Sequence, residues 1–172
     1  CKMKSNSIIM NSKVMLIVCL LLTSITVSAQ TMVNSLEELF PYLQQDSVEV
    51  VLKPGTYTII AEDIINDKFK SETNIDRHKA LVLLLFSGNS STYDFTNVNL
   101  HVETKVLTVY GEYDEFYEIQ VTGNNNVIKN LTMADIGSVN DYPKRRACNV
   151  VMDGANNKIE GLHLSTKGSY PY

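Results

Sequence analysis

The chain contains no tryptophan and only four prolines and three cysteines among its 172 residues. Two of the cysteines, Cys1 and Cys19, fall in the N-terminal segment, which leaves Cys148 alone in the rest of the chain. A disulfide scaffold within that remaining part is therefore excluded. Cys148 lies in an alternating apolar run, a position that favours a small core residue over a catalytic nucleophile.

Residues 1–29 have the pattern of a secretory signal peptide. Lys2, Lys4 and Lys13 form a basic region, and an unbroken apolar run, Val14 to Leu22, follows them before small residues end at Ala29. The apolar run is too short to span a bilayer comfortably, although a retained membrane anchor is the alternative interpretation. We therefore expect a secreted or periplasmic protein that has no membrane contact after cleavage.

Basic residues are scarce in the part of the chain that follows this segment. Removing the three lysines of residues 1–29 leaves 12 basic against 19 acidic residues, a net charge of −7. Such a surface repels phosphate backbones, so nucleic acid is excluded as the expected partner.

Three stretches of the chain repeat one another. The stretch from Gly123 to Met133 aligns without a gap on Gly154 to Leu164, 31 residues later, and a looser copy begins at Gly88. Apolar residues alternate before each of these glycines. A period of about 30 residues, made of short alternating runs around a Gly/Asn turn, is typical of a solenoid.

The rest of the chain divides around these repeats. Residues 30–60 predict an N-terminal cap helix, with Ser35 and Glu38 as a capping box and Pro41 as its break, followed by the first strands. Residues 61–80 are polar and charged and predict a surface excursion. Residues 81–172 predict stacked coils, of which further ones are expected beyond the C-terminus.

These features resemble the right-handed parallel β-helix of the pectin-lyase-like superfamily. The resemblance rests on the N-terminal amphipathic helix, the entry segment Val50 to Tyr57 and the repeated Gly-x-Asn-Asn turn. It implies an all-β fold, a right-handed parallel β-helix (solenoid) with a short N-terminal capping helix. It also implies that a polysaccharide binds on the sheet that precedes each turn.

The activity that this resemblance implies is carbohydrate chemistry on an acidic polysaccharide. A polysaccharide lyase acting by β-elimination is the favoured reading, and its catalytic candidates form the only dense basic cluster, Lys144, Arg145 and Arg146. Arginine forks match uronate carboxylates in two-point geometry, whereas the alternative is a solvated charged turn. A non-catalytic glycan-binding adhesin and a glycoside hydrolase of the same fold remain open.

Period-two alternation assigns the remaining candidates. It places Val82 inward and Leu83 outward before Gly88, and in the next two repeats it presents Glu118, Gln120 and Asn149 outward as substrate-binding residues. Tyr113 is a further candidate, as a platform for sugar rings, or else a loop aromatic packed onto the fold. Asp153 could bind calcium, the one candidate cofactor, or cap its turn through an Asx hydrogen bond. The oligomeric state is left open.

Overall fold

The computed structural model describes residues 29–75, 78–109, 113–137 and 146–166. Its helical segments are α2 (Leu36–Leu39), η1 (Phe40–Gln44), α3 (Ala61–Ile65) and η2 (Thr104–Thr108). Its strands are β1 (Thr31–Val33), β2 (Glu49–Leu52), β3 (Gly55–Ile59), β4 (Ser71–Ile75), β5 (His78–Phe86), β6 (Thr92–Asp94), β7 (Val98–Glu103), β8 (Glu115–Val121), β9 (Val127–Lys129), β10 (Thr132–Ile136), β11 (Arg146–Met152), β12 (Lys158–Glu160) and β13 (His163–Ser165).

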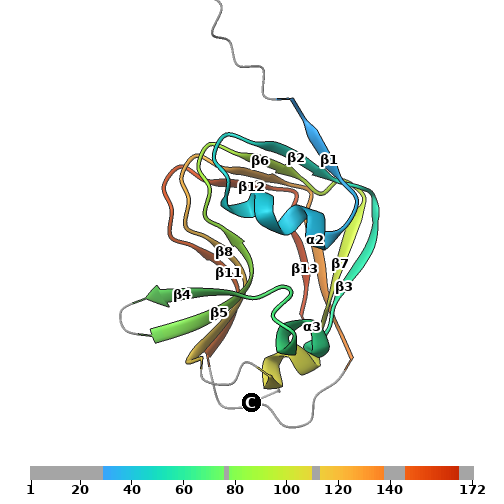
Figure 1. Cartoon of the computed structure of the whole chain (residues 1–172), viewed down its shortest axis with the longest axis vertical. Coiled ribbons are helices and arrows are strands. Elements are labelled where there is room, and N and C mark those ends of the chain that lie inside the picture. Colours follow the sequence, from blue (N-terminus) through green and yellow to red (C-terminus); the bar gives the residue numbers. More distant parts are fainter. Residues whose placement is uncertain (1–28, 76–77, 110–112, 138–145, 167–172) are drawn as a thin grey trace, which may run out of the picture.

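Three sheets surround one apolar core (Figure 1). Their strand orders are β1-β2-β6-β9-β12, β13-β10-β7-β3 and β11-β8-β5-β4. Strands at equivalent places in successive repeats pair in parallel, so that Tyr93 lies beside Ile128, and Ile128 beside Ile159. The sequence repeat therefore becomes a column of like side chains one strand apart.

A column of glycines forms the corner between β5, β8 and β11 and the strands that follow them. A Cβ atom built on Gly123 would lie 1.8 Å from the carbonyl oxygen of Gly88, and one on Gly154 would lie 1.8 Å from the oxygen of Gly123. Real Cβ atoms do not approach a backbone oxygen so closely. Only glycine lets the backbones of successive repeats stack at this corner.

Two residues after each of these glycines the backbone turns through the left-handed region. Ser90, Asn125 and Asn156 have φ of 56°, 58° and 58°. Asn126 then fixes the turn, because its side-chain amide donates to the carbonyl oxygen of Gly88 (2.8 Å) and its side-chain oxygen accepts from the backbone N–H of Ser91 (2.9 Å). Asparagine is favoured at such corners because it hydrogen-bonds locally and tolerates positive φ.

A fourth copy of this corner, which the sequence repeat did not reveal, lies at Gln45 to Ser47. Ser47 has φ of 57°, and its backbone N–H donates to the carbonyl of Asn89 (2.8 Å). A Cβ on Gly88 would lie 2.0 Å from the oxygen of Gln45. This corner can have Gln45 in place of glycine because it is the first described corner of the stack. No earlier described corner presents a carbonyl oxygen that the Cβ of Gln45 would meet.

The N-terminal helix starts at the predicted N-cap, Ser35, and stops before Pro41. The Ser35 hydroxyl accepts from the backbone N–H of Glu38 (3.2 Å), and the Glu38 carboxylate accepts from the backbone N–H of Asn34 (2.7 Å). The α-helix stops at Leu39, and Pro41 lies in the 3-10 segment that follows. Its apolar side chains are buried against the core, namely Leu36, Leu39 and Leu43.

The prediction of an all-β, right-handed parallel β-helix with a single capping helix is wrong in this form. The sheet β11-β8-β5-β4 is mixed, because β4 runs antiparallel to β5, and helical segments α3 and η2 lie between strands. The cause lies in the residues expected to form a surface excursion. The Asp63 carboxylate accepts from the backbone N–H of Ile60 (3.0 Å) and starts α3, which buries Ala61 and Ile64, and Phe69 is buried beyond it.

Strict alternation also fails in β5, β8 and β11. Val82, predicted inward, packs in a second apolar cluster with Leu85 and Tyr117, whereas Leu83, predicted outward, lies in the main core beside Leu84. Three residues are skipped in the strand register, and each lies at the same position in its own strand: Leu83 in β5, Glu118 in β8 and Asn149 in β11. One residue per strand is therefore out of phase, as at a bulge, and the residues before it point to the opposite face from the one predicted.

Replacing Asn126 by alanine tests the corner hydrogen bonds. Because Asn126 is fully buried, the variant leaves the N–H of Ser91 and the carbonyl of Gly88 without their partner. We expect a loss of about 2 to 3 kcal/mol in the free energy of unfolding, measured with urea. Asn124→Ala is the matched control and should cost under about 1 kcal/mol. Its exposed side chain accepts from the N–H of Ala155 and donates to the side chain of Asn89, and water can replace both hydrogen bonds.

Candidate functional site

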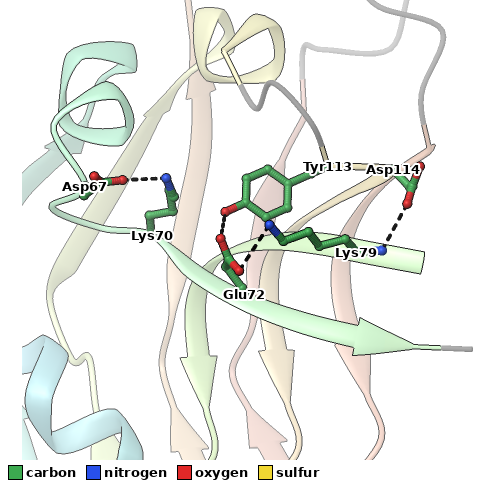
Figure 2. A network of polar contacts seen from close by, with 6 residues as sticks. All are labelled: Asp67, Lys70, Glu72, Lys79, Tyr113 and Asp114. Atoms are coloured by element: carbon green, nitrogen blue, oxygen red, sulfur yellow. Dashed lines mark hydrogen bonds and ion pairs between the residues drawn. The ribbon is translucent and has the colours of Figure 1, made fainter. Parts of the chain in front are cut away.

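Polar contacts gather at the edge where β5 and β8 begin (Figure 2). The Tyr113 hydroxyl donates to the Glu72 carboxylate of β4, and the Lys79 ammonium lies 3.4 Å from that carboxylate. The same ammonium lies 4.8 Å from the centre of the Tyr113 ring. The hydroxyl bond and the two charges around it lower the pKa of Glu72, so this carboxyl is ionised at neutral pH.

Of the two predicted roles of Tyr113, this arrangement fits an aromatic side chain packed onto the fold and not a platform for sugar rings. The residue is buried at 4% exposure, and its ring has the Lys79 ammonium over it, with the Lys70 ammonium 5.9 Å from its centre. The ring therefore offers no open face to a sugar, and it instead positions the lysines. Backbone bonds hold the edge together, since the N–H of Lys79 donates to the Asp114 carboxylate (3.1 Å) and the N–H of Asp114 to the carbonyl of Lys79 (2.8 Å).

One residue of the predicted catalytic cluster, Arg146, is the first residue of β11. Lys144 and Arg145 lie outside the described residues, as does the side chain of Arg146. The backbone of Arg146 is described, and it pairs with Glu115, which pairs in turn with Ala80. Strand register thus places the entry of β11 in line with the entries of β8 and β5, with β8 between β11 and the strand that carries Lys79.

Two predicted residues, Gln120 and Asp153, contact each other farther along the same sheet. The Gln120 side-chain amide donates to the Asp153 carboxylate (2.7 Å), and the Thr73 hydroxyl donates to the Gln120 side-chain oxygen (2.7 Å). Gln120 is fully buried by these contacts. It serves to join β4, β8 and the end of β11 rather than to contact a ligand.

Calcium binding at Asp153 finds no support in this geometry. A calcium site needs six to eight oxygen ligands, usually including several carboxylates. Among residues 29–75, 78–109, 113–137 and 146–166, no group of three or more His, Cys, Asp or Glu side chains could hold a metal ion. The amide of Gln120 already occupies one oxygen of the Asp153 carboxylate.

Glu118 and Asn149, both predicted to face a substrate, contact each other instead, and Glu118 is buried while Asn149 is half-buried. The Asn149 side-chain amide donates to the Glu118 carboxyl (2.8 Å), and Glu118 also contacts Asp135 of β10, which belongs to a different sheet. Glu118 and Asp135 are 5% and 6% exposed, so this is a buried pair of acids. The phase shift at Glu118 turns its side chain inward and brings the two carboxyls together.

Burial dominates the titration of Glu118. Loss of solvation raises its pKa to about 8, the hydrogen bond from Asn149 opposes that rise, and the charge of Asp135 adds to it. A neutral carboxyl at Glu118 can donate a hydrogen bond to Asp135, which avoids two adjacent buried charges. No signal in the sequence singled out Asp135, because its partner is distant along the chain and was assigned to the other face.

The comparisons with known proteins leave the family assignment open. No protein-family model matches this chain, and no curated protein matches it. The likeness to the pectin-lyase-like superfamily therefore stays a prediction. In the portion of the chain that is described, no helix has the length and apolar character needed to cross a membrane.

The buried acid pair predicts an unusual dependence of stability on pH. The pKa of Glu118 is raised from 4.5 to about 8, so the folded state holds a proton that the unfolded chain releases. Stability should be highest below pH 4.5 as far as this group is concerned, and should fall as pH rises toward 8 by on the order of 5 kcal/mol. Urea unfolding at a series of pH values measures this slope.

Glu118→Gln should flatten that slope and raise stability at pH 8, because the amide stays neutral while keeping a donor for Asp135. Glu62→Gln, at an exposed position on α3, provides the control and should leave the slope unchanged. An unaltered slope in Glu118→Gln would show that the carboxyl of Glu118 is not the titrating group.

Proposed function

We propose that this protein binds an acidic polysaccharide at the strand-entry edge, defined here as Lys70, Lys79 and Arg146 with the adjoining Lys144 and Arg145. The observation that supports this is the register that puts Arg146 level with Glu115 and Ala80, at the same end of the sheet as the entry of β5 and across β8 from it. The only dense basic cluster of the sequence thus includes a residue at the end of the sheet where Lys79 lies. Arginine and lysine are the side chains that recognise carboxylate groups.

Paired acids moderate the charge of this edge. Lys79 contacts Glu72 and Lys70 contacts Asp67, so both lysines already have anionic partners. The main attraction for a polymer carboxylate therefore comes from Arg146 and the two basic residues before it. Export, which residues 1–29 predict, would bring the protein to such polymers.

We favour binding without cleavage over lyase activity because the other predicted substrate-binding residues do not present free side chains at this edge. The side chain of Asn149 hydrogen-bonds the buried Glu118, and Gln120 is fully buried. A β-elimination reaction needs a base that reaches the proton of the substrate, and an arginine base is unfavourable because its pKa is above about 12. Cleavage is therefore an outcome to be measured beside binding.

Arg146→Gln should weaken binding to polygalacturonate by about tenfold, because one two-point, charge-assisted contact is lost. Lys79→Gln should weaken it less, since Lys79 is held by Glu72. Titration calorimetry measures both, with neutral dextran as the ligand control. Lys53→Gln makes the same change of charge at an exposed site between β2 and β3 and should bind as the unmodified chain does.

Ultraviolet absorbance of the same mixtures distinguishes the two functions. Binding with no unsaturated product supports the proposal, and unsaturated product that disappears in Arg146→Gln would establish a lyase instead. Equal affinity for dextran and polygalacturonate, or no affinity for a panel of uronate polymers, would contradict the proposed function.

A further inference from the structure

The carboxylate of Glu72 lies at the centre of the network in Figure 2, where two different donors hold it. Its Oε1 atom accepts a hydrogen bond from the Tyr113 hydroxyl, and its Oε2 atom lies 3.4 Å from the Lys79 ammonium. A neutral donor and a cation therefore meet separate oxygens of one carboxylate. Hydrogen bonds and cations arranged in this way are what a protein uses to bind a carboxylate ligand.

A second cation stands near the same carboxylate. The Lys70 ammonium lies 5.9 Å from the centre of the Tyr113 ring, and it contacts Asp67 in the turn after α3. The Tyr113 hydrogen bond lowers the pKa of Glu72 most, and the charges of Lys79 and Lys70 lower it further. Glu72 is thus held as an anion by one hydroxyl and by the field of two lysines.

The donors are fixed in the fold, whereas the carboxylate is open to solvent. Tyr113 packs in the main apolar core, and Lys79 belongs to β5, where it pairs with Asn74 of β4. The side chain of Glu72 is 47% exposed, against 33% for that of Lys79. An exposed ion pair contributes at most about 1 kcal/mol, so the contact between Lys79 and Glu72 is easily broken.

We propose that Glu72 is an internal competitor for the acidic polysaccharide: a uronate carboxylate of the polymer replaces the Glu72 carboxylate between the Tyr113 hydroxyl and the Lys79 ammonium. This inference rests on the proposed function and names the group that the polymer displaces. In the free protein Glu72 occupies both donors, and in the complex its side chain turns to solvent. Glu72 thereby sets the affinity below the value that the lysines would give without it.

The place of Glu72 in β4 allows this exchange without unfolding the strand. Ser71 before it is buried, and the hydroxyl of Thr73 after it donates to the Gln120 side chain (2.7 Å). Backbone pairing also places Glu72 beside Leu81 of β5. Because these contacts hold β4 on both sides of Glu72, only the Glu72 side chain has to rotate.

A competitor that is part of the chain also selects for polymers over single sugar acids. Glu72 is tethered beside its donors, so a free uronate must compete with a carboxylate at high local concentration. A polymer that is already held elsewhere on the strand-entry edge presents its next carboxylate at a high local concentration of its own. We therefore expect the polymer, and not the monosaccharide, to displace Glu72 from the unmodified chain.

Glu72→Gln tests the competition, because it removes the charge and keeps the shape of the side chain. We expect this variant to bind polygalacturonate about fivefold more tightly than the unmodified chain, since no exposed ion pair has to be broken. Glu49→Gln makes the same change on β2, which belongs to another sheet, and should alter the affinity by less than about twofold. Titration calorimetry at one salt concentration measures all three, and circular dichroism confirms that each is folded.

Lys79→Gln locates the exchange. It removes the cation for which the two carboxylates compete, so adding Glu72→Gln to Lys79→Gln should bring little of the gain seen in the single variant. Free galacturonate provides a second measurement. Its binding should be detected with Glu72→Gln at concentrations where the unmodified chain shows none.

The outcomes separate this inference from the proposed function on which it rests. If the unmodified chain binds polygalacturonate and Glu72→Gln binds it no more tightly, or gains no more than Glu49→Gln does, the competition is refuted and the proposed function stands. A gain that persists in full when Lys79 is also replaced would likewise exclude exchange at this ammonium. Absence of binding by every variant, Glu72→Gln included, would refute the proposed function and the competition together.

Discussion

The close stacking of backbone at Gly88, Gly123 and Gly154 is the constraint on which the rest of the structure depends. At each step the carbonyl oxygen of one corner occupies the place where a Cβ of the next would stand. This contact fixes the separation of successive repeats, and the amides of Asn126 and Asn157 each bond the preceding corner's carbonyl. Once the corners are stacked, the strands on either side are brought into parallel register.

Register then decides which side chains meet. It aligns the entries of β5, β8 and β11 at Ala80, Glu115 and Arg146, and so collects the charged groups around Tyr113 at one edge. It also aligns the residues that break the alternation in β5, β8 and β11, namely Leu83, Glu118 and Asn149. Because of this break, the side chain of Glu118 points toward Asp135. A buried acid pair and a charged edge thus arise from the same strand pairing.

The sequence repeat predicted the stacking of the three glycines and the pairing of like strands, and the spacing of Ser35 and Glu38 predicted the N-cap of the first helix. It could not predict the face of Glu118, because period-two alternation assumes that no residue is inserted, and one residue in each strand is out of phase. The corner at Gln45 could not be found from the glycine pattern, because no carbonyl oxygen of an earlier described corner lies against this position and glycine is therefore not required there. Strand β4 and helix α3 were missed because their charged sequences show little periodicity and depend on contacts with β5 and the core.

Urea unfolding of Gly123→Ala beside Thr122→Ala tests the central claim most directly. Both variants introduce alanine at neighbouring positions, but only Gly123→Ala places a new Cβ against the carbonyl oxygen of Gly88. The account predicts that Gly123→Ala loses at least about 3 kcal/mol or fails to fold, while Thr122→Ala stays within about 0.5 kcal/mol of the unmodified chain. Equal stability of the two variants would show that the corners do not stack as described.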